Sequence, residues 1–101
     1  MWRRPWSDAL GRLQAWHGSN CNGSWEHAHG VRIDTIDNPG WSVKIDLQGT
    51  PLLARDLRPV VIDRSDGDWV RCDVANGIFQ GWGGTTNLTE ILDIFLRWAD
   101  A

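Results

Sequence analysis

The histidines and cysteines of this sequence are the residues whose types could bind a metal ion. Cys21, His27 and His29 lie close together in the chain, and His17 or Cys72 could add a further ligand of the kind that Zn²⁺ prefers. The spacing matches no established zinc pattern, since paired Cys-x-x-Cys motifs are absent. We therefore expect hydrogen-bonded histidines at the surface or at a sheet edge, no metal site and no cofactor.

A cysteine nucleophile is the second chemistry that the residues could support. Cys21 lies in a polar loop with Glu26 and His27 nearby, so a Cys–His pair acting as in a sulfurtransferase is conceivable. A persulfide anion would need several backbone donors and a neighbouring cation, whereas this loop offers the carboxylate of Glu26. Cys72 is expected to face inward from a strand, where a thiol stays protonated. The sequence therefore predicts a non-enzyme without catalytic residues, and a small enzyme acting through Cys21 is the alternative.

Acidic and aromatic residues offer a third chemistry, which is recognition of another protein. The chain has eight Trp, no Tyr and two Phe, more large aromatics than a small core usually buries. Carboxylates beside exposed indoles suit a basic protein partner. Intramolecular roles are the alternative, since Trp82 could stack on Arg71 and Trp69 could be buried under a loop. The residues predicted to contact a partner are Trp25, Glu26, His27, Asp66, Asp68, Trp69, Asp73 and Trp82.

Two helices are predicted from the spacing of apolar residues, one toward each end of the chain. The first covers residues 7–17, with Ser7 as its N-cap and its end near Gly18. The second has Asn87 as its N-cap and Glu90 three residues further on, a variant of the capping box. Its apolar stripe consists of Leu88, Ile91, Leu92, Phe95 and Trp98.

A first β-hairpin is predicted from strands at 31–37 and 41–47, with Gly40 supplying a positive φ in the turn. If Asp37 faces Trp41, aliphatic residues pair with one another on one side of the hairpin. The pairs on that side are Thr35 with Val43, Ile33 with Ile45, and Val31 with Leu47. The charged pairs on the other side are Asp34 with Lys44, and Arg32 with Asp46.

Three more strands are predicted at 60–64, 69–75 and 78–82, after a connector at 48–59 that is either a loop or contains a short helical turn. Asn76–Gly77 is a strong hairpin signal. A two-residue loop there pairs Ala75 with Ile78, Val74 with Phe79, Asp73 with Gln80, Cys72 with Gly81, and Arg71 with Trp82. The residues then facing inward are Val70, Cys72, Val74 and Phe79, and those on the opposite face are Trp69, Arg71, Asp73, Gln80 and Trp82. The predicted fold is α+β: a helix, about five antiparallel strands and a helix, with both helices on one face of the sheet.

Length and composition limit the kind of protein. A chain of 101 residues has room for one domain, covering residues 1–101 with 1–6 as a variable N-terminal extension. Hydrophobic residues make up 42% and charged residues 23%, which fits neither disorder nor a membrane protein. Without a long apolar run or a signal peptide, we expect the cytoplasm. The net charge of −3 argues against nucleic-acid binding and favours a basic partner. Two cysteines are too few for a disulfide framework, although a single bridge between them stays open.

Several segments together match the pattern of a known family. They are CNGSWEH at 21–27, Gly30, DNPGWSVKIDL at 37–47, RSDGDW at 64–69 and NLTEILDIF at 87–95. With them the chain resembles the immunity protein 53 family of bacterial polymorphic toxin systems, from about Leu13 to Trp98. The resemblance implies a cytoplasmic antitoxin that binds a cognate toxin domain, and it supplies neither catalytic residues nor a mapped set of toxin contacts.

The leading hypothesis combines the resemblance with the acidic and aromatic residues. It describes an inhibitor that occupies or covers the active site of a toxin. Carboxylates would meet a basic cleft and speed encounter, and buried indoles would slow release. No nucleic acid or membrane is expected among its partners.

Overall fold

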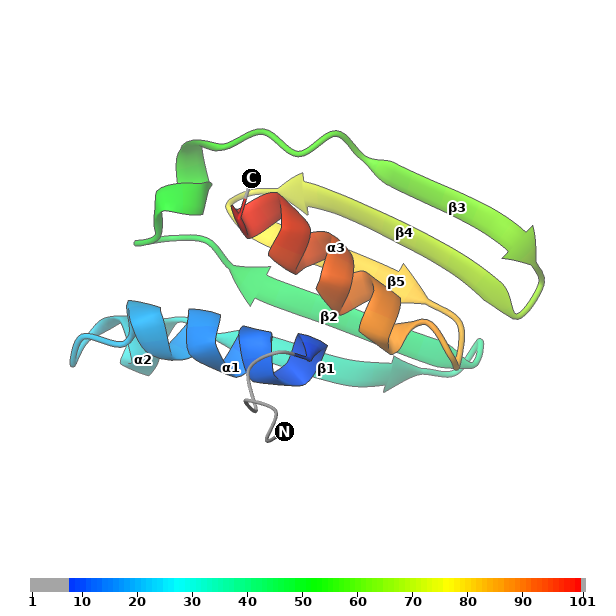
Figure 1. Ribbon diagram of the computed structural model, residues 1–101, viewed down its shortest axis with the longest axis horizontal. Helices are drawn as coiled ribbons and strands as arrows, with labels where there is room; N and C mark the ends of the chain where they lie inside the picture. Colours follow the sequence, from blue (N-terminus) through cyan, green and yellow to red (C-terminus); the bar gives the residue numbers. More distant parts are fainter. Residues whose placement is uncertain (1–7, 101) are drawn as a thin grey trace, which may run out of the picture.

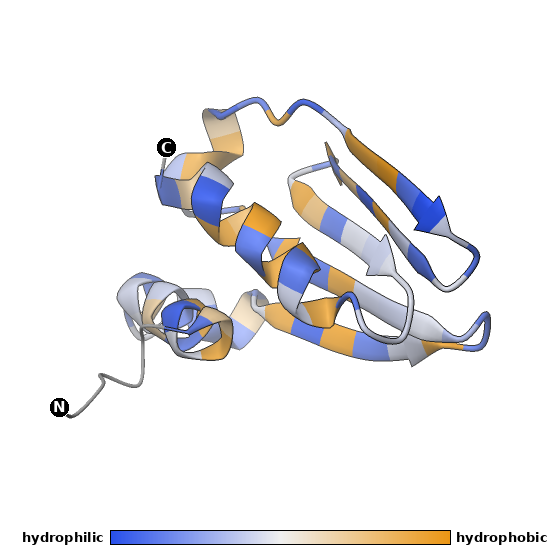
Figure 2. Ribbon diagram, turned by 45° about the vertical axis from the view of Figure 1, so that its right-hand side comes forward, coloured by the Kyte–Doolittle hydropathy of each residue, from blue (hydrophilic) through white to orange (hydrophobic). Residues whose placement is uncertain are grey.

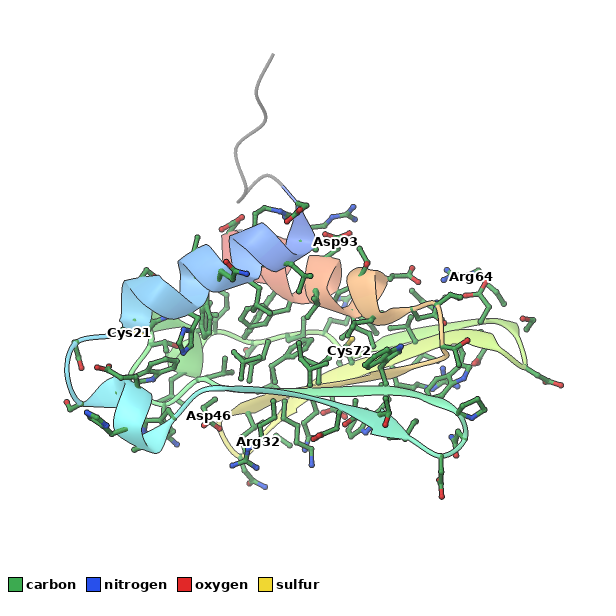
Figure 3. All side chains as sticks on the ribbon, turned by 90° about the horizontal axis from the view of Figure 1, so that it is seen from below. Cys21, Arg32, Asp46, Arg64, Cys72 and Asp93 are labelled. Carbon is green, nitrogen blue, oxygen red and sulfur yellow. The ribbon has the colours of Figure 1, made fainter. Side chains whose placement is uncertain are left out.

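Two long helices cover one face of a five-stranded antiparallel sheet in the computed structural model, which describes residues 8–100 (Figure 1). The elements in chain order are α1 (Ala9–Asn20), α2 (Trp25–Ala28), β1 (Val31–Ile36), β2 (Gly40–Asp46), the 3-10 helix η2 (Pro51–Ala54), β3 (Val60–Ser65), β4 (Asp68–Ala75), β5 (Ile78–Gly83) and α3 (Leu88–Asp100). The strand order is β1-β2-β5-β4-β3. Figure 3 shows α1 and α3 on the same side of the sheet. The predicted α+β fold is confirmed.

Helix α1 differs from its prediction at both ends. Its N-cap is Asp8, whose carboxylate accepts a hydrogen bond of 2.6 Å from the Gly11 N–H. The predicted cap, Ser7, and the predicted extension at 1–6 lie outside the described residues. The helix passes Gly18 and ends at Asn20, because Gly18 does not take the positive φ of a glycine C-cap.

Helix α3 buries the predicted apolar stripe and begins differently from a capping box. Asn87 precedes the helix, but its side-chain oxygen accepts from the N–H of Gly84 at 3.1 Å. Its amide nitrogen donates to Asp68 at 2.9 Å and to Glu90 at 3.2 Å. The predicted link between Asn87 and Glu90 therefore exists as a contact between side chains, and the same amide ties the helix start to β4.

The first hairpin has a register two residues away from the predicted one. Ile36 pairs with Gly40, so the turn is 37–39 and contains a cis peptide before Pro39. A shift of two residues leaves every side chain on its predicted face. The charged partners change, however: Arg32 faces Lys44, and Asp34 faces Ser42. The predicted ion pairs of this hairpin are wrong.

Close packing on β5 explains why Gly40 belongs to a strand and not to the turn. A Cβ atom at Gly40 would lie 2.0 Å from the carbonyl oxygen of Gly83. Trp41, the next residue, pairs directly with Gly83. The glycine is therefore required for the approach of β2 to β5, and it does not have the positive φ that we predicted.

The second hairpin confirms the prediction in full. All five predicted residue pairs between β4 and β5 occur, from Ala75 with Ile78 to Arg71 with Trp82. Asn76 has φ 55° and Gly77 has φ 75°, the left-handed conformations that a two-residue hairpin turn requires. Between the hairpins, the connector at 48–59 contains the short helical turn η2, which buries Leu52.

The hydrophobic core lies between the sheet and the helices. Apolar and polar residues alternate along the strands β1 and β2 in Figure 2, and the apolar ones face the core. Phe95 of α3 lies at the centre, with its ring centroid 5.1 Å from that of Phe79 and 4.9 Å from that of Trp16. Cys72 is 2% exposed, and burial raises the pKa of its thiol to about 12. Cys21 is exposed. Both cysteines are free, so the disulfide bridge that the sequence left possible between them does not form.

Candidate functional site

The face of the sheet away from the helices carries three of the eight predicted contact residues, Trp69, Asp73 and Trp82. We call it the outer face, and its side chains alternate along the strands with those of the core. Figure 3 shows Arg32 and Asp46 on this side and Cys72 on the side of the helices. Neither α1 nor α3 lies on the outer face (Figure 3). Its side chains on the central strands are Ser42, Lys44, Asp46, Trp69, Arg71, Asp73, Ile78, Gln80 and Trp82.

Two indoles form the aromatic part of the outer face. Trp82 on β5 is half-buried and lies between Ser42 on β2 and Arg71 on β4. Trp69 on β4 is also half-buried and faces Asp63 on the edge strand. The Arg71 guanidinium lies 5.9 Å from the centroid of the Trp69 ring. The cation–π contact considered for Trp82 thus forms on Trp69.

Arg71 is held in place from several sides. It donates to the carboxylate of Asp63 at 2.7 Å and to the carbonyl oxygens of Ile62 at 3.2 Å and Val70 at 3.1 Å. These contacts join the edge strand β3 to β4 across the outer face. The planar guanidinium of Arg71 therefore packs against Trp69, and the Asp63 carboxylate neutralises the charge of Arg71.

Three loops gather at one end of the sheet, which we call the hairpin end. They are the β1–β2 turn at 37–39, the β3–β4 turn at 66–67 and the loop at 84–86 before α3 (Figure 1). The indole N–H of Trp41 donates to the Thr85 carbonyl at 3.0 Å, and the Gly84 N–H donates to the Trp69 carbonyl at 3.2 Å. The loop at 84–86 is therefore fastened to β2 and to β4, the strand that carries Trp69.

Negative charge is concentrated toward the hairpin end. The acidic side chains there are Asp34, Asp37, Asp63, Asp66, Asp68 and Glu90, against the two arginines Arg64 and Arg71. Both arginines are engaged in ion pairs with acidic residues of the chain. Asp34, Asp37 and Asp66 are exposed and have no ion pair among residues 8–100.

Asp68 is a predicted contact residue whose carboxylate is already occupied. One oxygen accepts from Arg64 at 2.9 Å and the other from Asn87 at 2.9 Å. The hydrogen bond from Arg64, followed by that from Asn87, lowers the pKa of Asp68. Arg64 also bonds Glu90 and lowers its pKa. Asp68 therefore connects the β3–β4 turn to the start of α3.

Asp73 is the predicted contact residue with an unused acceptor. It lies on the outer face, opposite Gln80. Its Oδ1 atom is buried and has no hydrogen-bond partner within the described part of the chain. Because this oxygen is buried, another protein could reach it only after the Asp73 side chain changes its rotamer.

The remaining predicted residues lie elsewhere, at α2, near the opposite end of the sheet (Figure 1). Trp25 is only 5% exposed, and its indole N–H donates to the Gln48 carbonyl at 2.7 Å. The expected surface position of Trp25 is wrong, because α1 and the loop after β2 enclose the ring. Glu26 accepts from the N–H groups of Asn22 at 2.9 Å and Gly23 at 2.8 Å. Hydrogen bonds from its own N–H and from these two groups lower the pKa of Glu26.

His27 is exposed beside these residues. The structure therefore brings together Trp69, Asp73 and Trp82 on one face and Asp66 at its end, and separates them from Trp25, Glu26 and His27.

A comparison of the sequence with models of protein families identifies the family of this chain. The family model described as immunity protein 53 matches residues 10–100. The chain belongs to this family. Comparisons with curated proteins and with solved structures gave no match. Among the described helices, none combines the length and apolar character needed to cross a membrane.

For this member of the immunity protein 53 family, sequence reasoning missed one acidic residue of the outer face. Asp34 was assigned to Lys44, but it faces Ser42 and carries an unpaired charge within the described residues. The correct hairpin register would have found it. Asp37, at the turn, was assigned only a pairing role.

Within residues 8–100, the Cys21 thiol contacts atoms of one residue, His17. Its sulfur lies 3.9 Å from Nδ1 of His17, and its thiol donates to the His17 carbonyl at 3.3 Å. Glu26, the nearby carboxylate, is occupied by backbone N–H groups. No group of three or more His, Cys, Asp or Glu within residues 8–100 is placed to hold a metal ion.

Proposed function

We propose that the chain is an antitoxin that binds its cognate toxin domain through the outer face and the hairpin end and thereby blocks the active site of the toxin. Membership of an immunity protein family supports a toxin as the partner. The observation on which the location depends is the pair of half-buried indoles, Trp69 and Trp82, on a sheet face that neither long helix covers. Aromatic residues on such a face are typical anchors of protein interfaces.

The distribution of charge supports a basic surface on the toxin. Toward the hairpin end, six carboxylates stand against two arginines, a local excess of negative charge in a chain whose net charge is −3. The unpaired members Asp34, Asp37 and Asp66 would attract a basic cleft and accelerate association. Asp73, half-buried on the outer face, would add a further carboxylate to the surface that the toxin contacts.

The proposed surface therefore differs from the predicted set. It keeps Trp69, Trp82, Asp66 and Asp73 and adds Asp34 and Asp37. It omits Trp25, which is buried, and Glu26, His27 and Asp68, which lie apart or are occupied within the chain.

A binding measurement with single variants tests the location. The toxin encoded by the neighbouring upstream gene, made catalytically inactive, is titrated with the antitoxin and with its Trp82→Ala and Trp69→Ala variants. Loss of an aromatic anchor costs about 2 kcal/mol or more, so each Kd should rise at least about 30-fold. Leu10→Ala on α1, where the side chain is 57% exposed on the helical side, is the control and should bind as the unchanged protein does. Unchanged binding by both Trp variants would exclude this surface.

The electrostatic part has a separate test. Asp37→Asn and Asp66→Asn should lower the association rate and weaken its dependence on salt, with little change in the dissociation rate. Asp56→Asn, an exposed acid of the connector, is the matched control. An equal effect of all three variants would show that only total charge matters.

A further inference from the structure

The two edge strands of the sheet are protected to different degrees. At the β1 edge, Val31 and Ile33 pack against the core beneath α1, and the outward residues Arg32 and Asp34 are charged. Charged side chains at an edge discourage pairing with another strand. The edge strand β1 is therefore closed to a further strand.

The edge strand β3 is protected less. Val60 and Ile62 also pack against the core and Asp63 and Arg64 are charged, but the outer-face residue Val61 is an exposed aliphatic side chain. Val60, Val61 and Ile62 follow one another along β3, and Val61 is 64% exposed. α3 packs mainly on β4 and β5, and the inner side of β3, with the half-buried Val60 and Ile62, lies beside it (Figure 1). A groove of about 490 Å³ remains between β3 and α3, lined by Val60, Ile62 and Ile94 together with polar residues of α3.

We propose that an extended segment of the toxin adds to β3 as a sixth strand; this inference rests on the proposed function. Within the part of the chain that the structure describes, no strand lies on the side of β3 away from β4, so alternate peptide groups along that side lack a strand partner. The backbone of another strand is the group that matches such a row of donors and acceptors. The edge is also continuous with the proposed surface, since Val61 pairs with Arg71, the outer-face neighbour of Trp82.

The length of the added strand is limited at both ends. Pro59 has no N–H to donate, and the register shifts between Asp63 and Ser65. Arg64, within that shift, is bound to residues of the chain itself. The available edge is therefore 60–63, about 13 Å of extended chain.

The side chains along the edge define the chemistry of the segment. Val61 on the outer face favours an apolar residue opposite it, and Asp63, whose Oδ1 bonds Arg71 but whose side chain is 65% exposed, could share its carboxylate with a further cation. On the inner side, apolar residues would extend over Val60 and Ile62 into the groove. The segment is thus a short strand that is apolar on both faces and carries Lys or Arg at one end.

A second copy of the chain fits this edge poorly. In an antiparallel pair centred on Asp63, the two Asp63 carboxylates would face each other. In a pair centred on Ile62, Val61 would face Asp63, and Val60 would face Arg64. In a pair centred on Val61, Pro59, which has no N–H to donate, would face Asp63 of the other copy. Each symmetric register places like charges together or a charge against an aliphatic side chain, which disfavours it.

Hydrogen exchange and one variant test the inference. Amide exchange is followed by mass spectrometry in the free chain and in the complex with inactive toxin, and peptides covering β3 should become protected while those covering β1 do not. Val61→Asn removes the exposed aliphatic side chain and should weaken toxin binding about tenfold with little change in thermal stability. Leu10→Asn is the matched control, since Leu10 is 57% exposed on α1.

The outcomes separate this inference from the proposed function. If Trp82→Ala weakens binding but β3 stays unprotected, the added strand is excluded and the proposed surface remains. Protection of β3 in the free chain, together with sedimentation as a dimer, would assign the edge to a second copy and overturn the inference. A toxin that does not bind the chain at all overturns both.

Discussion

Trp25 and Trp82 should respond in opposite ways to truncation, because one is part of the fold and the other belongs to the proposed contact surface. Trp25 is 5% exposed, lies edge-on to Trp16 at 6.1 Å between ring centroids, and donates its indole N–H to Gln48. Trp82 is half-buried on the outer face. Trp25→Ala should destabilise the fold strongly, and Trp82→Ala only slightly.

The magnitudes follow from burial. Truncating a buried Trp to Ala costs about 3–5 kcal/mol, and the Gln48 carbonyl also loses its donor. Small domains are stable by about 5–15 kcal/mol, so Trp25→Ala removes a large part of the total. A half-buried residue on an open sheet face contributes about 1 kcal/mol or less through its cross-strand contacts. Trp25→Phe keeps most of the ring and should cost about 1–2 kcal/mol.

Urea unfolding followed by far-ultraviolet circular dichroism measures the difference without relying on the fluorescence of the altered indoles. With a slope of about 1.5 kcal/mol/M, the midpoint should fall by roughly 2–3 M for Trp25→Ala and by less than about 0.7 M for Trp82→Ala. Equal midpoints for the two Ala variants, or a loss below about 1 kcal/mol for Trp25→Ala, would refute the reasoning that Trp25 is a core residue.

Three further outcomes are expected. Arg64 lowers the pKa values of Asp68 and Glu90, so the stability from these contacts is complete above the ordinary Glu value of 4.5 and is lost as the pH falls through the lowered values. In the Arg64→Met variant, the urea midpoint should depend less on pH below 4.5 than it does in the unchanged protein. An equal pH dependence in the two proteins would contradict this. One thiol, that of Cys21, should react with a thiol reagent in the native protein and two after unfolding, because burial raises the pKa of Cys72 to about 12; fast reaction of two native thiols would disagree. Cys21→Ala should still protect a cell that expresses the toxin, whereas loss of protection by a folded variant would favour the Cys21-dependent enzyme.

Local sequence patterns predicted much of the fold. The β4–β5 hairpin was predicted residue by residue, because Asn76 and Gly77 favour the left-handed conformations of a two-residue turn and the turn sets the register. The stripe of α3 was also predictable, since its spacing alone determines which side chains share a face. On the outer face, the same alternation placed Trp69, Asp73 and Trp82 together.

Contacts between residues far apart in the chain decided the rest. Gly40 entered a strand because it must pack against Gly83, and this moved Asp34 away from Lys44. Trp25 entered the core because a carbonyl at Gln48 could accept its N–H. In both cases the local pattern allowed two arrangements of similar local energy, and close packing and a buried hydrogen bond selected one of them. The amino-acid sequence by itself determined the order of the elements and the face of each side chain, whereas the tertiary structure decided which charges stay unpaired and which indoles reach solvent.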